Sequence, residues 1–440
     1  MPTPTGAEPR LAAATAAAAV LDRGRALDEA LGDTLVGLSA PRDRALARRL
    51  SHALMRDWPA ANFLVGQLVR RRPARRDRLV HFILAVALVE LRQAREPARA
   101  VVYAAVEAAA RGGLKHLRGL VNAALRSYQR RRGELEAALP ADPVHRFGYP
   151  EWLIEAVRRD WPADWERILG EGNASPPLWL RVNRRRWSVE QARQALAEAG
   201  LETHAVAGLP DALVLHQRVA ISQLPGFADG RLSIQDGAAQ ATVEYLRLAP
   251  GLRVLDACAA PGGKSAHALE REDLDLTAVE IDPQRLERVS ATFARLSLSA
   301  RLLAGDAARP QRWWDGQPYD RILIDAPCSA SGVMRRHPDI RWLRRASDLA
   351  GLVELQAQML DAVWPLLKPG GILVYATCSI FKAENETQAQ RFLEQHADAR
   401  TFHLPHLPGQ LQPHGRQVLP GEADMDGFYH LAVERMRGRS

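Results

Sequence analysis

The chain has 440 residues, which is too long for one ordinary hydrophobic core, so we expect two or three domains. Its three cysteines, Cys258, Cys328 and Cys378, include no Cys-x-x-Cys pair, which argues against a disulfide framework and a metal site and favours a reducing cytoplasm. No apolar run approaches the roughly 20 residues that cross a bilayer, so the sequence predicts no membrane segment.

The net charge of +8 is concentrated in one part of the chain. Residues 1–140 contain 24 Arg and Lys against 13 Asp and Glu, whereas residues 141–440 contain 35 against 38. The basic residues gather in two clusters, which are Arg70, Arg71, Arg72, Arg75, Arg76 and Arg78, then Arg130, Arg131 and Arg132. Such clusters suit the phosphate backbone of a nucleic acid. A solvated arginine-rich surface is the alternative interpretation.

Residues 1–140 are predicted to form an all-helical domain. The alanine-rich stretch Leu11 to Leu21 resembles a signal peptide weakly, but alanine is a strong helix former, so we interpret it as the first helix. Apolar residues recur at three- and four-residue spacing in Ala45 to Met55 and Leu79 to Leu91, which indicates further helices. The stretches Arg44 to Arg56 and Leu120 to Arg126 resemble helices of the NusB-type RNA-binding fold.

A small α+β module is predicted for residues 145–230, after a boundary rich in proline at residues 140–143. Its expected elements are a strand at Leu178 to Val182, a helix at Val189 to Ala199 and a strand at Ala212 to Leu215. Arg181 and Arg184 stand at the end of the first strand. Two interpretations stay open for them: contacts to an RNA backbone, or charges that flank a strand end.

Residues 231–440 alternate strands with helices, which predicts a parallel, Rossmann-like sheet with right-handed crossovers. The expected strands are Val254 to Asp256, Leu276 to Ile281, Arg301 to Leu303, Arg321 to Ile324 and Gly371 to Ala376. The expected helices begin at Ser265, Arg285 and Leu349, and the last one runs to Leu367. Phe428 to Val433 follows turn residues and is predicted as a late edge strand.

The first loop of that sheet, Asp256-Ala-Cys-Ala-Ala-Pro-Gly-Gly-Lys-Ser265, is a candidate ligand-binding loop. Its glycines allow close backbone approach, and the amino end of the next helix favours a negative group. It is not a phosphate-binding loop, because that pattern needs glycine where Cys258 stands, and it is not the dinucleotide fingerprint. Carboxylates follow four strands, at Asp256, Glu280, Asp306 and Asp325. Four acids at one edge of a parallel sheet predict a ligand cleft.

Five motifs carry a family resemblance. They are Asp-Ala-Cys-Ala-Ala-Pro-Gly-Gly-Lys (256–264), Val-Glu-Ile-Asp-Pro (279–283), Asp-Ala-Pro-Cys-Ser (325–329), Arg-Arg-His-Pro-Asp (335–339) and Tyr-Ala-Thr-Cys-Ser (375–379). Together they resemble the S-adenosylmethionine-dependent RNA (cytosine-5)-methyltransferases. The resemblance implies a multidomain chain with a NusB-like RNA-binding domain (1–140), the small module (145–230) and a Rossmann-like methyltransferase domain (231–440). The helical extension favours 16S ribosomal RNA as the substrate and partner.

The resemblance also implies a cofactor site for S-adenosyl-L-methionine. Its expected residues are Cys258, Ala259, Ala260, Pro261, Gly262, Gly263, Lys264, Glu280, Asp306 and Asp325. The loop would hold the methionine end, Glu280 the ribose and Asp306 the adenine side, while Asp325 would lie beside the transferred methyl group. Glu280 departs from the family, in which Asp is common at this position, so the reach of the acid is shifted.

Methylation of cytosine at carbon 5 explains why two thiols would be needed. Carbon 5 is a poor nucleophile, so a protein group must first add to carbon 6, and a thiolate combines nucleophilicity with leaving-group ability. The residues alone do not rank Cys328 against Cys378, since both follow strands of one sheet. The resemblance assigns Cys378 as the nucleophile, Cys328 to product release and Asp325 to activation of the base.

Arg335, Arg336 and His337 follow the Cys328 loop and are predicted to contact RNA, with capping of the next helix as the alternative. The target base has to be unstacked, so a single-stranded or loop cytosine is expected. A tRNA cytosine-5 methyltransferase and a non-catalytic RNA-binding assembly factor are the alternative functions. The oligomeric state is left open, with a monomer as the expectation.

Overall fold

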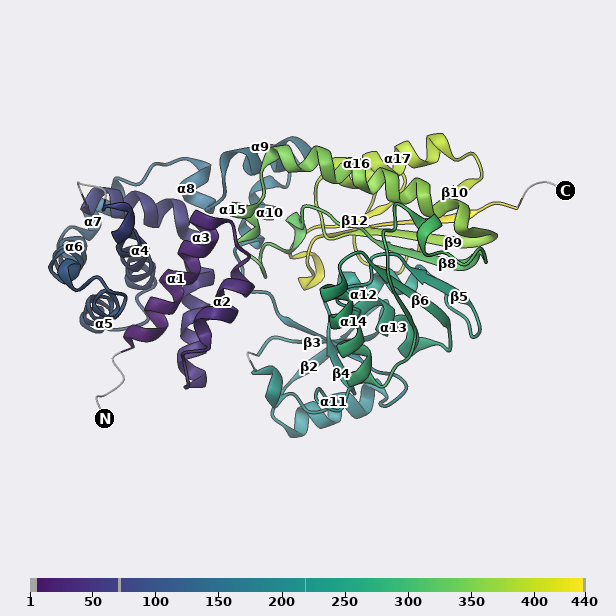
Figure 1. The fold of residues 1–440 in the computed structure, drawn as a ribbon, viewed down its shortest axis with the longest axis horizontal. Helices are drawn as coiled ribbons and strands as arrows, with labels where there is room; N and C mark the ends of the chain where they lie inside the picture. The colour runs from purple at the N-terminus through teal and green to yellow at the C-terminus, as the bar shows by residue number, and fades with distance from the viewer. Residues whose placement is uncertain (1–5, 70–72, 218, 438–440) are drawn as a thin grey trace. The chain divides into compact units, whose positions relative to one another are not determined.

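The computed structural model describes residues 6–69, 73–217 and 219–437, which form two compact units (Figure 1). Unit 1 runs to Asn173 and also includes Arg336–Ala346, and unit 2 contains Ala174–Arg335 and the chain from Ser347 onward. The observed division therefore differs from the predicted boundary near residue 140. The helices between residues 143 and 171 belong to the helical unit, and so does a segment from the second half of the chain.

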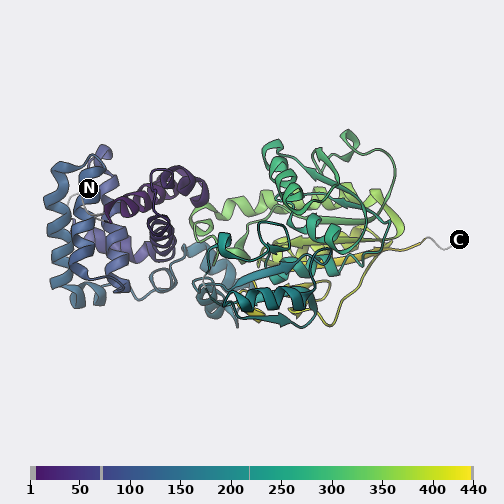
Figure 2. The ribbon, with the colours of Figure 1, turned by 90° about the horizontal axis from the view of Figure 1, so that it is seen from below.

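Unit 1 is all-helical in the residues described, as the sequence predicts (Figure 2). Its helices are α1 (Ala7–Arg23), α2 (Leu27–Leu35), α3 (Pro41–Leu68), α4 (Leu79–Gln93), α5 (Ala98–Arg111), α6 (Arg118–Arg130), α7 (Arg132–Ala137), α8 (Pro143–Phe147), α9 (Glu151–Asp160), α10 (Trp165–Glu171) and α15 (Ile340–Leu343). Helix α4 is largely apolar and is buried at Val80 and from Phe82 to Leu91, so it lies in the core of the unit. Alanines on α1 are fully buried, and their small side chains let α1 pack against α2, α3, α4 and α5.

Residues 336–346 are held inside unit 1 by buried polar contacts. Arg341 is fully buried and donates from Nη1 to the carbonyl of Gly148 (3.0 Å) and from Nη2 to the carbonyl of Gly172 (3.1 Å). Its guanidinium carbon lies 3.7 Å from the ring centroid of Tyr149. Trp342 donates its indole N–H to the carbonyl of Met55 (2.7 Å). The motif at 335–339 therefore begins in unit 2 and continues into unit 1.

Unit 2 contains a four-stranded antiparallel sheet in the order β2-β3-β1-β4. The strands are β1 (Leu178–Val182), β2 (Thr203–Val206), β3 (Leu209–Leu215) and β4 (Leu232–Ile234), with helix α11 (Val189–Glu198). The predicted strands and helix of the small module are confirmed. Strands β2 and β4 are not predicted from the sequence, because both are short and β2 has no fully buried residue.

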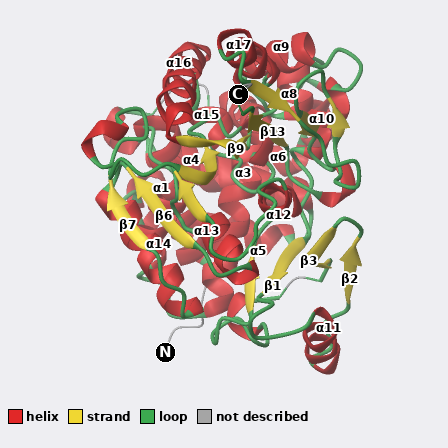
Figure 3. Ribbon diagram, turned by 90° about the vertical axis from the view of Figure 1, so that its right-hand side faces the viewer, coloured by secondary structure: helices red, strands yellow, loops and turns green. Residues whose placement is uncertain are grey.

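The larger sheet of unit 2 is mixed and has the order β11-β12-β13-β9-β8-β5-β6-β7, with β10 paired to β13. Its strands are β5 (Arg253–Asp256), β6 (Asp275–Glu280), β7 (Arg301–Ala304), β8 (Tyr319–Asp325), β9 (Leu367–Thr377), β10 (Ala399–Thr401), β11 (Gln410–Leu411), β12 (Arg416–Val418) and β13 (Phe428–Arg435). Strands β6, β7, β9 and β13 are labelled in Figure 3. The five predicted strands are confirmed as a parallel set. The predicted edge position of β13 is wrong, because β13 pairs with β9, β12 and β10.

Helices cover both faces of this sheet: α12 (Gly237–Glu244), α13 (Gly263–Arg271), α14 (Pro283–Leu296), α16 (Ala346–Val363) and α17 (Glu386–Gln395). Neighbouring residues of β8 point to opposite faces, as strand geometry requires. Ile322 and Ile324 pack in the core with α16 and α17, whereas Leu323 packs with α12 and the small sheet. Helix α16 ends four residues before its predicted end at Leu367, because Pro365 cannot continue it and Leu367 begins β9.

Within the described residues, no helix combines the length and the apolar character needed to cross a membrane.

Candidate active site

The four predicted acids lie at the carboxyl ends of parallel strands. Asp256 is the last residue of β5, Glu280 the last residue of β6 and Asp325 the last residue of β8, while Asp306 follows β7 by two residues. Because β8, β5, β6 and β7 are successive neighbours in the parallel sheet, these acids share one edge. This is the edge at which open α/β sheets bind their ligands.

The loop from Asp256 to Gly263 is held tightly by its own polar groups. The buried carboxyl group of Asp256 accepts hydrogen bonds from the Ser265 hydroxyl and from the amide of Cys258 (3.4 Å). Burial raises the pKa of Asp256 to about 6. Gly262 has a positive φ of 95°, and a Cβ at this position would lie 3.2 Å from Cγ1 of Val289. The turn into α13 therefore requires glycine here.

Glu280 and Lys264 connect this loop to the neighbouring strand ends. Glu280 is buried and accepts hydrogen bonds from the amides of Ala260 (3.3 Å) and Asp282 (3.2 Å). Lys264 Nζ lies 2.6 Å from Oδ2 of Asp325. The Asp325 side chain keeps 29% of its surface exposed, so it remains reachable from solvent.

Asp306 lies in the turn after β7. Its Oδ1 accepts a hydrogen bond from the amide of Ala308 (2.9 Å), and its Oδ2 lies 3.6 Å from Nε of Arg309. Its backbone carbonyl accepts the indole N–H of Trp313 (2.8 Å). These contacts fix the turn and leave part of the carboxylate surface exposed.

The two predicted catalytic thiols lie side by side. The Sγ atoms of Cys328 and Cys378 are 3.4 Å apart, although 50 residues separate them in sequence. The loop after β8 and the loop after β9 also join through the amide of Gly332, which donates to the carbonyl of Cys378 (2.9 Å). The hydrogen bond to Cys378, together with burial, raises the pKa of Cys328 well above its usual value.

The third cysteine has a different environment. Cys258 lies in the loop after β5, where burial and the carboxylates of Asp256, Asp325 and Glu280 raise the pKa of its thiol. This environment disfavours a thiolate at Cys258.

One acid of this region, Glu384, was not anticipated from the sequence. It is fully buried, and its carboxyl group accepts hydrogen bonds from Ser329 and Ser379, which directly follow the two cysteines. The only sequence signal is an acidic residue six positions after Cys378, in a segment without a periodic pattern.

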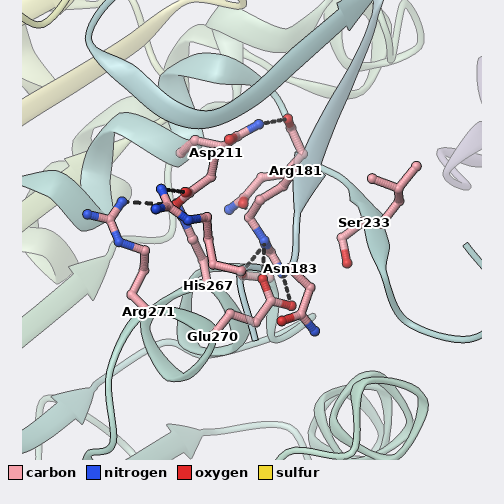
Figure 4. A network of polar contacts seen from close by, with 12 residues as sticks. Arg181, Asn183, Asp211, Ser233, His267, Glu270 and Arg271 are labelled. Carbon is pink, nitrogen blue, oxygen red and sulfur yellow. Dashed lines mark hydrogen bonds and ion pairs between the residues drawn. The ribbon is translucent and has the colours of Figure 1, made fainter. Parts of the chain in front are cut away.

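Two of the arginines predicted to contact RNA, Arg181 and Arg335, are buried and pair with carboxylates inside unit 2. Arg181 is 1% exposed and forms a forked pair with Glu270, with Nε to Oε2 at 2.8 Å and Nη2 to Oε1 at 3.0 Å (Figure 4). Arg335 is 2% exposed and pairs with Asp426. We therefore correct the prediction of RNA contact for both residues, because their guanidinium groups are withdrawn from solvent.

The other predicted RNA-contacting residues are more accessible. The Arg184 side chain is half exposed and donates to Asp211 (3.1 Å). Arg336 and His337 belong to unit 1, where the exposed His337 lies 3.5 Å from Asp28. In the basic clusters, the exposed members are Arg75, Arg76, Arg78, Arg130, Arg131 and Arg132, while Arg70, Arg71 and Arg72 lie outside the described residues.

Three family matches cover most of the chain. Residues 243–434 match the 16S rRNA methyltransferase RsmB/F family, residues 149–222 the ferredoxin-like domain of RsmF/B-like methyltransferases, and residues 7–130 the NusB family. These matches confirm the predicted fold class, with a NusB-like helical domain, a small α+β module and a Rossmann-like methyltransferase domain.

Individual proteins are similar over nearly the whole length. The chain is 44% identical over 429 residues to ribosomal RNA small subunit methyltransferase B of Vibrio cholerae serotype O1, covering 97% of both chains. It is 45% identical over 431 residues to the protein of the same name from Xanthomonas campestris pv. campestris, again covering 97% of both. In fold it is similar to the crystal structure of PH0851, with a TM-score of 0.81 and 22% identity over 99% of this chain and 100% of that one. The chain belongs to the RsmB/F family of 16S rRNA methyltransferases.

Proposed function

We propose that this protein methylates carbon 5 of an unstacked cytosine in 16S ribosomal RNA, with S-adenosylmethionine as the methyl donor. The observation that carries the proposal is the pair of thiols, Cys328 and Cys378, whose Sγ atoms lie 3.4 Å apart at the ends of neighbouring strands. Asp325, three residues before Cys328, places a carboxylate at the same strand end. A cytoplasmic location belongs to the same proposal, because reducing conditions keep both cysteines in the thiol form.

The loop and strand ends around Asp256 suit the proposed cofactor. Helix α13 begins at Gly263, and its first amides and positive dipole end suit the carboxylate of a methionine moiety. Glu280 suits the ribose hydroxyls, and the neighbouring Ile281 is 65% exposed and offers an apolar surface to a purine. Asp306 would lie on the adenine side. When bound, the cofactor supplies an electrophilic methyl group on a sulfonium.

The Cys378 thiolate is proposed to attack carbon 6 of the cytosine and form a carbon–sulfur bond. Carbon 5 then takes the methyl group, a base removes the proton from carbon 5, and the carbon–sulfur bond breaks to return the thiolate. Cys328 is proposed to assist this release. Its raised pKa keeps it as a thiol at neutral pH, which disfavours it as the attacking nucleophile. Cys378 is also the more exposed of the two.

Asp325 is proposed to hydrogen-bond the edge of the cytosine and favour its activated form. Lys264, whose Nζ lies 2.6 Å from Oδ2 of Asp325, holds this carboxylate in place. The partial exposure of Asp325 leaves one side of it open to a base.

The substrate is tested by incubating the protein with cofactor carrying a tritiated methyl group and with deproteinised 16S RNA or tRNA. We expect 5-methylcytosine in the 16S RNA. Transfer to tRNA instead would contradict the proposed substrate, and transfer to neither RNA would favour a non-catalytic assembly factor.

The roles of the thiols are tested by trapping the covalent intermediate on denaturing gels. Cys328→Ala should accumulate a protein–RNA adduct, because release is impaired after attack by Cys378. Cys378→Ala should form no adduct, and the opposite pattern would exchange the two roles. Cys258→Ala serves as the control for the loss of a thiol, since it should not accumulate adduct.

A further inference from the structure

Glu384 lies where the two thiol-bearing loops meet. It ends the short turn Lys382–Glu384 after β9, and its side chain is 0% exposed. A carboxyl group is costly to bury unless several donors satisfy it, so its position calls for an explanation.

The carboxyl oxygens of Glu384 accept hydrogen bonds from both loops. Oε1 accepts from the amide of Ser329 (2.8 Å) and from Nε2 of Gln356 on α16 (3.1 Å). Oε2 accepts from the hydroxyls of Ser329 (2.6 Å) and Ser379 (2.5 Å). Ser329 directly follows Cys328, and Ser379 directly follows Cys378. One side chain therefore binds the residue next to each thiol.

We propose that Glu384 is a positioning residue that fixes the backbones of Cys328 and Cys378 so that their thiols stay within reach of each other and of one cytosine ring. This inference rests on the proposed covalent mechanism, in which attack and release use different thiols on the same base. Without Glu384, the hydroxyls of Ser329 and Ser379 still contact each other (3.2 Å), but the amide of Ser329 and the side chain of Gln356 lose their shared acceptor. The two loops would keep the hydrogen bond from the amide of Gly332 to the carbonyl of Cys378, but the position of Ser329, and with it Cys328, would be less tightly fixed.

The negative charge of Glu384 also affects the thiol of Cys328. It contributes to the raised pKa of Cys328, after the hydrogen bond to Cys378 and burial. A thiol that keeps its proton does not compete with Cys378 for attack on carbon 6 of the base.

Glu386 provides a matched control two residues along the chain. Its carboxylate accepts hydrogen bonds from the amide of His414 (2.9 Å) and the hydroxyl of Tyr429 (2.8 Å). Neither partner belongs to the thiol-bearing loops, so E386Q removes the same charge from the same segment without touching Ser329 or Ser379.

The first experiment measures how fast diamide joins Cys328 to Cys378 in the free protein, followed by non-reducing peptide mapping. Diamide accepts two electrons and two protons as the two thiols become a disulfide. Because a disulfide forms only within narrow geometric limits, we expect about a tenfold slower reaction in E384A. E384Q, which keeps one oxygen acceptor, should be intermediate, and E386Q should match the unaltered protein.

The second experiment separates positioning from general loosening of the fold. In E384Q, methyl transfer should show kcat lowered by roughly 10- to 100-fold with KM for cofactor within twofold, since misplacement of reacting groups by about 1 Å has effects of this size. Equal slowing of disulfide formation in E386Q, or an unchanged rate in both E384A and E384Q, would overturn the proposal. If E384A fails to fold, E384Q decides the question. The diamide reaction needs neither RNA nor methyl transfer, so its result stands even if the proposed function fails.

Discussion

Removing either member of the buried ion pair Arg181–Glu270 should destabilise unit 2 strongly. Both side chains are 1% exposed, and they join β1 of the small sheet to α13 (Figure 4). Arg181 also donates from Nη1 to the carbonyl of Gly263 (2.8 Å) and to Oε1 of Gln235 (2.5 Å). The perturbations are R181M, E270M and the double variant R181M/E270M.

The burial of both side chains determines how much each variant should lower the free energy of unfolding. Each single variant leaves one charge buried without its partner, which typically costs about 3–5 kcal/mol. The double variant removes both charges and replaces them with apolar side chains, so only the acceptors Gln235 and Gly263 lose a donor, and we expect a total cost of about 1–3 kcal/mol. The two single costs should therefore exceed the cost of the double variant by about 3 kcal/mol or more, which is the coupling expected between contacting residues.

The free energy of unfolding is measured by urea denaturation followed by circular dichroism at 25 °C. Hydrogen–deuterium exchange of peptides from α13 assigns the affected transition to unit 2. The control is R185M, because the Arg185–Asp273 pair is exposed at both ends, with 40% and 86% of the side-chain surfaces accessible. Exposed pairs contribute about 0–1 kcal/mol, so R185M should change little.

Two outcomes would refute this reasoning about the buried pair. If the double variant costs as much as the two single variants together, the charges are not coupled. If both single variants cost under about 1 kcal/mol, like an exposed pair, then the burial of Arg181 and Glu270 has no energetic consequence.

A glycine and a buried histidine give two further predictions. Gly262→Ala should lower the free energy of unfolding, measured by urea titration, by about 1–2 kcal/mol, because residue 262 has a positive φ and lies close to Val289. Gly263→Ala is the control and should change the free energy of unfolding little, because Gly263 has no positive φ and a Cβ there would meet its nearest neighbour at 3.8 Å. Burial lowers the pKa of His430 to about 3 in the folded protein, below its value of about 6.5 in the unfolded chain. The unfolded chain therefore binds more protons between about pH 3 and 6.5, and the free energy of unfolding falls as the pH falls through this window. Between pH 7 and 5 the loss from His430 should be roughly 2 kcal/mol, and urea titrations of His430→Gln should lack this part of the pH dependence.

The sequence predicts most of the larger sheet because buried parallel strands have a strong local signal. Strand β8 contains the apolar run Ile322 to Ile324, which ends at the carboxylate of Asp325, and β9 contains a longer apolar run from Ile372 to Ala376. The position of β13 carries no such signal, since its pairing with β12 and β10 depends on segments of only three residues each. The membership of residues 336–346 in unit 1 was equally hidden, because it depends on partners such as Gly148, nearly 200 positions earlier in the chain.

The candidate site likewise has one feature that the sequence predicts and one that it does not. The nearness of Cys328 and Cys378 follows from two adjacent parallel strands that both end in a cysteine-bearing loop. The role of Glu384 does not follow in this way, because a glutamate in a short turn is ordinarily exposed. Only the folded chain shows that four donors from three segments converge on its carboxyl group.

The number of arginines in the sequence is larger than the number available to bind RNA. Some arginines are buried in ion pairs, and others are exposed at the surface. Arg181 and Arg335 are neutralised by carboxylates 89 and 91 residues away in sequence, and a pair of this kind releases no counterions when a nucleic acid binds. Arg75 and Arg76 in unit 1 are exposed, and their cluster contributes six of the 24 basic residues among the first 140. For the proposed RNA substrate, the salt-dependent attraction to phosphate therefore belongs to the exposed arginines. Arg181 instead holds α13, and Arg335 holds the segment at residues 424–426, so loss of activity on their replacement would report on the geometry of unit 2 rather than on RNA affinity.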